Sequence, residues 1–319
     1  MSKIRIISSE TELEREVQRS FQYNLQIEQK SFYFNEGVEK YYARVPKEQI
    51  EKDKATVTNL GEKIINKCFK KNEIIKFISL GCGNGEVEKE LLKQTKEKGH
   101  KVKYYGIDSS MTMIEKAIKN YENEKFETQF IYADFSNEKF KNELDNIIDK
   151  SKKKIFAFLG STIGNVPQQY IANTLRNILN KGDILWIGTQ AEKELSDSIA
   201  NSYFKRYLNW INTPENLEFL KYPLKNKNVD LNKGKIILEM IKEKSLKTLI
   251  FKYGFLVNDK INFKNGDDKF TLLKGDVINL LTIRVYELQS LIDFFENREF
   301  KLITYEREEE TIQIAFEKQ

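Results

Sequence analysis

One stretch, Phe77 to Glu86, constrains the fold more than any other part of the chain. It reads Phe-Ile-Ser-Leu-Gly-Cys-Gly-Asn-Gly-Glu, so a short apolar run ends in three glycines at alternate positions and a helix-forming segment follows. This pattern predicts a strand, a tight turn and a helix. Because glycine has no Cβ, we expect the backbone to approach a ligand closely, with its N–H groups and the helix N-terminus facing it.

The next predicted strand ends in Asp108, about 20 residues beyond the glycines, where a carboxylate can accept hydrogen bonds from a ribose diol. The spacing Gly-x-Gly-x-Gly resembles the first motif of Rossmann-like methyltransferases that depend on S-adenosylmethionine (SAM), more than the Gly-x-Gly-x-x-Gly of dinucleotide-binding proteins. No Gly-Lys-Ser/Thr follows, which disfavours a phosphate-binding loop. A turn that merely closes a βα unit remains an alternative.

Strand and helix patterns alternate after this point. We expect strands at residues 75–80, 103–107, 129–133, 154–159 and 183–189, and helices at 86–97, 110–121, 137–149 and 167–179. Such alternation predicts an α/β fold, with a parallel sheet, helices on both faces and ligands at the carboxyl ends of the strands. A helix at 284–297 and an antiparallel hairpin, 301–306 with 311–317, are expected to complete the sheet.

The N-terminal segment and the stretch after residue 191 depart from this alternation. We expect helices at 11–29, 49–70 and 192–211, strands near 235–243 and 248–255, and a hairpin whose turn spans 264–268. The resulting domain hypothesis has two parts. Residues 57–190 plus 284–319 form a Rossmann-like, SAM-binding domain, and residues 1–56 plus 191–283 form a smaller α+β substrate or lid domain.

Composition limits the partners and the compartment. The chain of 319 residues is 40% hydrophobic, enough for a sizeable core, and its 53 basic residues nearly balance 48 acidic ones, which favours solvated faces over a nucleic-acid groove. The absence of a long uncharged apolar run and of a signal-peptide core predicts a cytoplasmic protein without a membrane partner. Cys68, Cys82 and the single His100 lack metal-ligand spacing, so we expect no metal. We also expect a monomer.

A second run, Phe158 to Asn165, follows the fourth expected strand and reads Phe-Leu-Gly-Ser-Thr-Ile-Gly-Asn. It resembles the signature of the histidine-specific Nα-methyltransferase family, whose members trimethylate histidine on the way to ergothioneine; fungal dimethylallyltryptophan N-methyltransferases are similar. Tyr33, four residues before Gly37, is similar to the cofactor-covering tyrosine of that family. The resemblance spans nearly the whole chain, from about Tyr33 to the C-terminus.

The resemblance implies that SAM is the cofactor and S-adenosylhomocysteine the product. The residues themselves support part of the site, because Asp134 and Phe135 follow the third expected strand, where an acid and a ring could bind adenine. An Asx turn at Asp134 is the alternative. The cofactor-binding positions that we expect are Tyr33, Gly81, Cys82, Gly83, Asp108, Ser109, Asp134, Phe135 and Gly160.

The acceptor side departs from the family. Two residues that grip the imidazole of histidine, a Glu and a Ser, fall on Leu281 and Ile283 here. An imidazole N–H left without a partner would cost about 1–3 kcal/mol, so histidine is a poor substrate candidate. The carboxamide of Asn165 suits the amino or carboxylate group of an amino acid, since it both donates and accepts. The candidate substrate-binding residues are Asn165, Tyr41, Tyr42, Met240, Leu281 and Ile283.

These observations favour a SAM-dependent N-methyltransferase that acts on a small amine or amino acid other than histidine. In-line displacement needs mainly alignment of the amine with the methyl group, and the neutral amine would pass its proton to water or to Tyr33, the candidate catalytic residue. Two alternatives remain. One is SAM-dependent transfer to another acceptor, either methylation of a macromolecule or aminocarboxypropyl transfer; the other is a SAM-binding protein that has lost catalysis.

Overall fold

The computed structural model describes residues 3–137, 139–149, 153–160, 162–265 and 268–319. The chain divides into two compact units. Unit 1 comprises Met1–Ser9, Pro46–Lys193 and Glu287–Gln319, and unit 2 comprises Glu10–Val45 and Glu194–Tyr286. The domain boundaries inferred from the sequence differ from this division mainly at residues 1–9 and 46–56, which cluster with unit 1.

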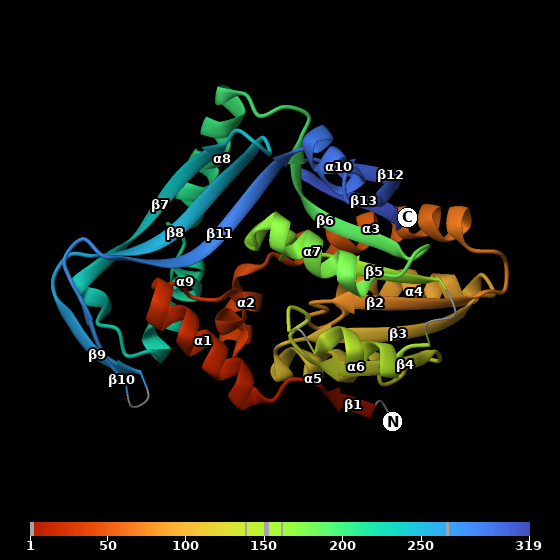
Figure 1. The fold of residues 1–319 in the computed structure, drawn as a ribbon, viewed down its shortest axis with the longest axis horizontal. Helices are drawn as coiled ribbons and strands as arrows, with labels where there is room; N and C mark the ends of the chain where they lie inside the picture. The colour runs from red at the N-terminus through yellow and green to blue at the C-terminus, as the bar shows by residue number, and fades with distance from the viewer. Residues whose placement is uncertain (1–2, 138, 150–152, 161, 266–267) are drawn as a thin grey trace. The chain divides into compact units, whose positions relative to one another are not determined.

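Unit 1 is built on a mostly parallel sheet with helices on both faces (Figure 1). Its strands are β1 (Lys3–Ile6), β2 (Ile74–Leu80), β3 (Lys101–Asp108), β4 (Glu127–Tyr132), β5 (Lys154–Phe158), β6 (Ile184–Glu192), β12 (Phe300–Glu308) and β13 (Thr311–Lys318). The parallel strands run in the order β1, β4, β3, β2, β5, β6, and β13 and β12 continue the sheet as an antiparallel hairpin beside β6. The carboxyl ends of β2 to β5 therefore meet along one edge.

The helices of unit 1 flank its sheet (Figure 1). They are α3 (Lys47–Cys68), α4 (Glu86–Glu97), α5 (Met111–Tyr121), α6 (Phe140–Ile147), α7 (Gln168–Ile178) and α10 (Leu288–Glu296), with a 3₁₀ turn, η2 (Thr162–Asn165). Ser110 caps α5 by accepting the N–H of Met113. Leu60, Leu91 and Ile114 are fully buried and join α3, α4 and α5 in one core cluster. Burial of side chains of this size stabilises the fold by about 1.5–3 kcal/mol each.

Unit 2 combines helices with antiparallel strands. Its elements are α1 (Glu10–Asn24), η1 (Gln29–Tyr33), α2 (Gly37–Arg44), α8 (Asp197–Trp210), α9 (Pro214–Asn226), η3 (Leu231–Lys233), β7 (Gly234–Glu243), β8 (Thr248–Val257), β9 (Ile261–Asn265), β10 (Asp268–Leu272) and β11 (Val277–Glu287), whose last residue belongs to unit 1. Strand β8 lies between β7 and β11, and β9 pairs with β10. Phe251 and Tyr253 of β8 are fully buried, and Tyr207 of α8 packs against Phe251. One face of this sheet therefore forms the core of unit 2.

The predicted fold class, a Rossmann-like α/β sheet with a smaller α+β part, is confirmed. The helix expected from residue 284 is wrong at its start, because Arg284 to Tyr286 pair with β8 as part of β11. Several elements were not predicted, among them β1, α2, α9 and the part of β11 before residue 284. The hairpin after residue 261 is present, but Gly266 and Asp267 of its turn lie outside the described residues. Among the helices described, none is both long and apolar enough for a membrane crossing.

Candidate functional site

The glycines after β2 divide into two kinds. Gly81, Gly83 and Gly85 have φ values of 70°, 55° and 66°, in the left-handed region that glycine occupies without strain. A Cβ at Gly81 or Gly83 would meet no atom within 4 Å, whereas a Cβ at Gly85 would lie 2.7 Å from the Tyr121 ring. Gly160, after β5, also has a positive φ and open space beside it. Gly81, Gly83 and Gly160 thus leave room for a ligand, and Gly85 is needed for packing.

The N–H groups of this turn are bound within the protein. Those of Gly81 and Cys82 both donate to the carbonyl oxygen of Ile107, over 2.8 and 2.9 Å, and that of Gly83 donates to Oδ2 of Asp108 over 2.9 Å. The expectation that the N–H groups of the turn face a ligand is therefore wrong for these three residues. A phosphate-binding loop needs free N–H donors, so this turn is a poor anion site. It suits a ligand that packs against the backbone without hydrogen bonds to these N–H groups.

Asp108 stands at the end of β3, half-buried. Its carboxylate accepts the N–H groups of Gly83 and Ser110, both over 2.9 Å, and that of Ser109. Burial raises the pKa of Asp108 to about 6, the three N–H donors oppose that rise, and the negative charge of nearby Asp134 adds to it. At neutral pH the group is a carboxylate fixed in place as a hydrogen-bond acceptor.

Asp134 and Phe135 follow β4 on the same sheet edge. The Oδ1 atom of Asp134 accepts the N–H of Ser136 over 2.8 Å and its hydroxyl over 2.5 Å, so the Asx turn considered from the sequence is present. The N–H of Asp134 donates to Oγ of Ser8 over 3.1 Å. The Phe135 ring meets Phe158 edge-on, with centroids 5.3 Å apart. The Asp134 carboxylate is therefore fixed close enough to Asp108 to affect its pKa, and the Phe135 ring is held by Phe158.

A buried layer that sequence reasoning missed supports the glycine turn. The rings of Tyr104 and Tyr121 are stacked, with centroids 4.7 Å apart. The Tyr104 hydroxyl donates to the Glu88 carboxyl over 2.8 Å, and the Tyr121 hydroxyl donates to the carbonyl of Gly85 over 2.8 Å. Burial raises the pKa of Glu88, and it raises that of the Cys82 thiol well above its usual range. The Cys82 side chain is thus in the core, and only its backbone could meet a ligand.

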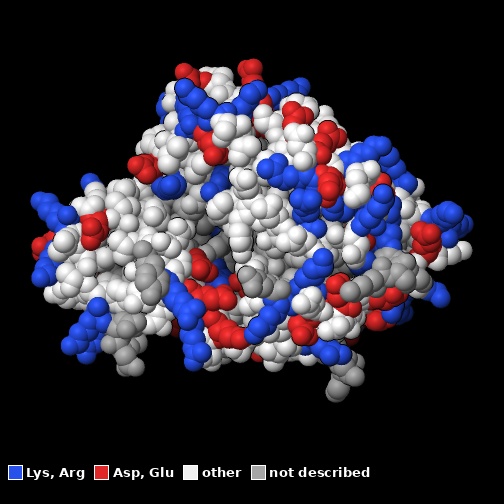
Figure 2. Space-filling view, viewed as in Figure 1, with Lys and Arg blue, Asp and Glu red and all other residues white. Residues whose placement is uncertain are grey.

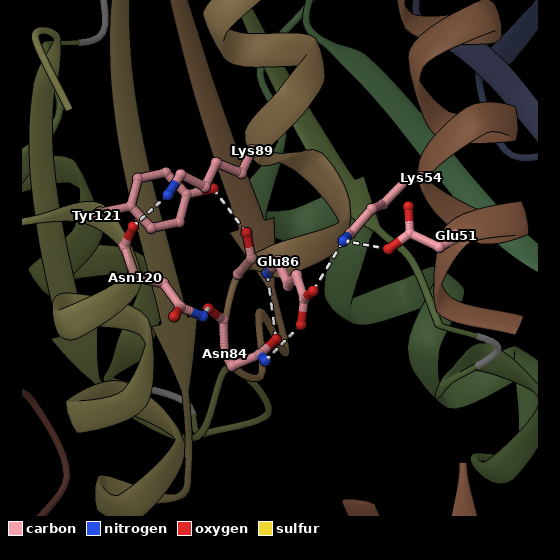
Figure 3. A network of polar contacts seen from close by, with 8 residues as sticks. Glu51, Lys54, Asn84, Glu86, Lys89, Asn120 and Tyr121 are labelled. Carbon is pink, nitrogen blue, oxygen red and sulfur yellow. Dashed lines mark hydrogen bonds and ion pairs between the residues drawn. The ribbon is translucent and has the colours of Figure 1, made fainter. Parts of the chain in front are cut away.

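A polar groove of about 680 Å³ borders the turn on the side of α3. Figure 3 shows Lys54 of α3 between Glu51 and Glu86, with N···O distances of 2.7 and 2.8 Å. The Asn120 carboxamide donates to the carbonyl of Asn84 over 2.9 Å. The side chains of this groove thus bind one another and brace the turn.

In unit 2, Tyr33, the predicted cofactor-covering residue, lies in one ring cluster with the predicted substrate residues Tyr41 and Tyr42. Tyr33 and Tyr41 have ring centroids 5.3 Å apart, and Tyr41 and Tyr42 have centroids 5.4 Å apart. Phe219 of α9 lies 6.2 Å from both Tyr33 and Tyr41. The guanidinium carbon of Arg44 lies 4.6 Å from the Tyr41 centroid and 4.4 Å from that of Phe219. Sequence reasoning missed Phe219 of α9 and Arg44 of α2, because neither helix was predicted.

The other predicted acceptor residues of unit 2 share one sheet face. Met240 of β7 and Ile283 of β11 are both paired with Phe251, and Leu281 is paired with Tyr253. Residues paired across strands point to the same face, here the buried one. All three side chains are partly buried and pack against the core cluster of unit 2. The two positions where the family carries Glu and Ser are therefore in apolar surroundings.

Asn165 belongs to unit 1 and ends η2. It is half-buried, and its carboxamide makes no hydrogen bond to another residue in the described part of the chain. Ser161, in the same signature run, lies outside the described residues. The amide of Asn165 is thus available to a ligand.

The chain matches one family model and is similar to solved structures. A model of the histidine-specific, SAM-dependent methyltransferase family matches residues 13–313. A solved SAM-dependent methyltransferase from Clostridium acetobutylicum ATCC 824 is 12% identical, with 83% of this chain and 90% of that chain covered and a TM-score of 0.43. A protein from Pyrococcus horikoshii OT3 is 17% identical, with 88% and 98% covered and a TM-score of 0.47. No curated protein matches the sequence.

The residues present fit SAM. The open space at Gly81 and Gly83 admits a ligand against the backbone, and Asp108 is a fixed acceptor suited to the hydroxyls of a ribose. The N–H groups of Gly81, Cys82 and Gly83 already have partners within the protein, and a cofactor that carries no phosphate does not need them. The family match covers all but the ends of the chain. The chain therefore belongs to the histidine-specific, SAM-dependent methyltransferase family, and it is an enzyme whose cofactor is SAM.

Proposed function

We propose that this methyltransferase acts on the amino nitrogen of a small amine or amino acid with an apolar side chain, and that histidine is not its substrate. The observation that carries the proposal is the environment of Leu281 and Ile283, which lie among Phe251 and Tyr253 on a buried sheet face. Neither side chain can accept or donate a hydrogen bond. An imidazole at these positions would lose the partners it has in water, at about 1–3 kcal/mol for each group.

On the cofactor side, each proposed contact has a geometric reason. Asp108 would accept the ribose hydroxyls, and Asp134 and Phe135 would bind the adenine. The glycines with open space, Gly81 and Gly83, would admit the carboxypropyl end. The other proposed cofactor-binding positions are the backbone of Cys82, Ser109, Gly160 near the sulfonium, and Tyr33, which would cover the cofactor.

When bound, SAM would supply an electrophilic methyl group on a sulfonium, with a neutral thioether as the leaving group for the attack by the amine lone pair. The protein mainly aligns the acceptor, which can account for much of the rate enhancement. Asn165 would orient the amino group through its carboxamide. The proton that the methylated nitrogen loses would pass to water or to the Tyr33 hydroxyl.

The distribution of charge supports a small acceptor. On the face that Figure 2 draws, basic and acidic side chains are interspersed. A nucleic-acid site more often shows a continuous basic stripe with exposed rings. Methylation of a macromolecule is therefore the second candidate, and the experiment below separates the two.

The test is a panel of free amino acids and amines incubated with SAM that carries a deuterated methyl group. We expect S-adenosylhomocysteine and a methylated product with an apolar amino acid or amine, and little or none with histidine. Asp108→Ala is the control for contaminating activity. Preferred methylation of histidine, or methylation confined to added protein or RNA, would overturn the proposal.

A further inference from the structure

Arg44, at the end of α2, holds its guanidinium among aromatic rings. Its Cζ atom lies 4.4 Å from the centroid of Phe219, 4.6 Å from that of Tyr41 and 5.5 Å from that of Trp210. The Nε atom is buried and has no hydrogen-bond partner among the described residues, and within that part of the chain no carboxylate forms an ion pair with Arg44. All of these residues belong to unit 2.

This environment is incomplete for an arginine. The guanidinium is always charged and carries five N–H donors in a planar fork. Contacts with ring faces compensate part of the charge, but they do not replace an acceptor for the buried Nε–H. A carboxylate has the matching geometry, because its two oxygens accept two parallel N–H groups.

Another ring-stacked arginine of unit 2 shows that stacking on rings does not by itself leave a guanidinium without a hydrogen-bond acceptor. Arg206 lies 4.4 Å from the Tyr203 ring and 5.0 Å from the Tyr207 ring, yet it donates to the Tyr207 hydroxyl over 3.4 Å. Arg44 has the stacking without such an acceptor. The missing partner is therefore a property of this position.

We propose that Arg44 binds the carboxylate of the acceptor, so that the substrate class is an amino acid and not a simple amine. This inference rests on the proposed function, since it concerns the acceptor of that reaction. The rings of Tyr41, Phe219 and Trp210 surround the charge with apolar surface, which suits a side chain without polar groups.

The experiment compares each amino acid with the amine that lacks its carboxylate. The probes are phenylalanine and phenethylamine, tryptophan and tryptamine, and leucine and isoamylamine, titrated calorimetrically into protein saturated with S-adenosylhomocysteine. We expect one amino acid to bind at least about 10-fold more tightly than its amine. Arg44→Met should weaken that amino acid by about 10- to 100-fold and leave the amine unchanged.

Two further variants separate binding from folding. Arg44→Lys keeps a charge on the rings but loses the fork, so an intermediate loss is expected. Arg206→Met removes the other stacked guanidinium and should leave the affinity for the amino acid unchanged. Retained affinity for S-adenosylhomocysteine shows that each variant is folded. If Arg44→Met does not fold, the affinity of Arg44→Lys for the amino acid tests the inference.

The inference is overturned if none of the amino acids binds, if amines bind as well as amino acids, or if the Arg44 variants keep the preference for the carboxylate. Methyl transfer to simple amines at equal efficiency would overturn it and leave the proposed function standing. Carboxylate-dependent binding without any transfer would overturn the proposed function and leave Arg44 as a carboxylate site.

Discussion

The two units present their candidate residues in different ways. In unit 1, Gly83, Asp108 and Asp134 stand at the ends of successive strands, and backbone conformation and hydrogen bonds fix them. In unit 2, Tyr41 and Phe219 come from helices far apart in the chain and meet only through side-chain packing. A site made from strand ends follows from topology and changes little with side-chain substitution elsewhere. A site made from packed side chains can change its ligand while the fold stays the same.

This comparison predicts that cofactor affinity depends on unit 1, and the largest effect is expected at Asp108. Replacement by Ala removes the acceptor for the ribose hydroxyls and leaves the N–H of Gly83 unpaired, so SAM should bind about 100-fold more weakly. Calorimetric titration measures the change. Asp276→Ala is the matched control, because the Asp276 carboxylate also accepts a backbone N–H, that of Leu273, but belongs to unit 2. Equal losses in both variants would contradict the comparison.

The pH dependence of SAM binding should follow the protonation of Asp108. The carboxylate of Asp108 is the form that accepts hydroxyl hydrogen bonds, and with a pKa of about 6 it becomes protonated as the pH falls. The dissociation constant of SAM should therefore be about 10-fold higher at pH 5 than at pH 7. Asp108→Asn should bind weakly at both values, with no such slope.

Loss of stability should not explain that slope. The pKa of Asp108 is raised in the folded protein, so the folded state binds this proton more tightly than the unfolded chain does. This group therefore adds stability as the pH falls from about 6 towards 4, the window in which SAM affinity decreases. A thermal melting curve at each pH separates the two effects. A flat affinity profile for the wild type would remove Asp108 from the ribose site.

A pair of glycines sharpens the comparison within unit 1. Gly83 and Gly182 both have a positive φ and open space for a Cβ. Alanine at either should cost about 1–2 kcal/mol of folding stability, since both force a side chain into the left-handed region. Only Gly83→Ala should weaken SAM, by about 5-fold, because only there would the new methyl group meet the cofactor. Equal SAM affinity in the two variants would mean that the turn serves the fold alone.

The smallest expected effect is at Tyr33, a unit 2 residue with a proposed role toward the cofactor and the proton. Because water can also take the proton, Tyr33→Phe should lower kcat by only about 3-fold, with the affinity for SAM retained. Tyr42→Phe, at a candidate substrate-binding position of the same ring cluster, is the comparison variant. An unchanged kcat in Tyr33→Phe would mean that water accepts the proton. A larger decrease of kcat in Tyr42→Phe than in Tyr33→Phe would mean that Tyr42, and not Tyr33, accepts it.

Local sequence was sufficient for most of unit 1. The elements from Ile74 to Ile178 lie within a few residues of the predicted ranges, because apolar periodicity, the glycine turn and the Ser110 cap act over short distances. Other elements need distant partners. Strand β1 is short and is stabilised by β4, and residues 284–286 are a strand because they pair with β8. Such pairing cannot be recognised in either segment alone.

The sequence by itself determined the fold class, the place of the cofactor turn and the acid that follows it, since each depends on a pattern within a few residues. Only the tertiary structure decided where the turn directs its N–H groups, because their acceptors belong to β3. It also placed Arg44 among rings from α2, α8 and α9 with no acceptor for its buried Nε in the part of the chain described. Local patterns fix the backbone, whereas the partners of a side chain depend on which distant segments the fold brings beside it.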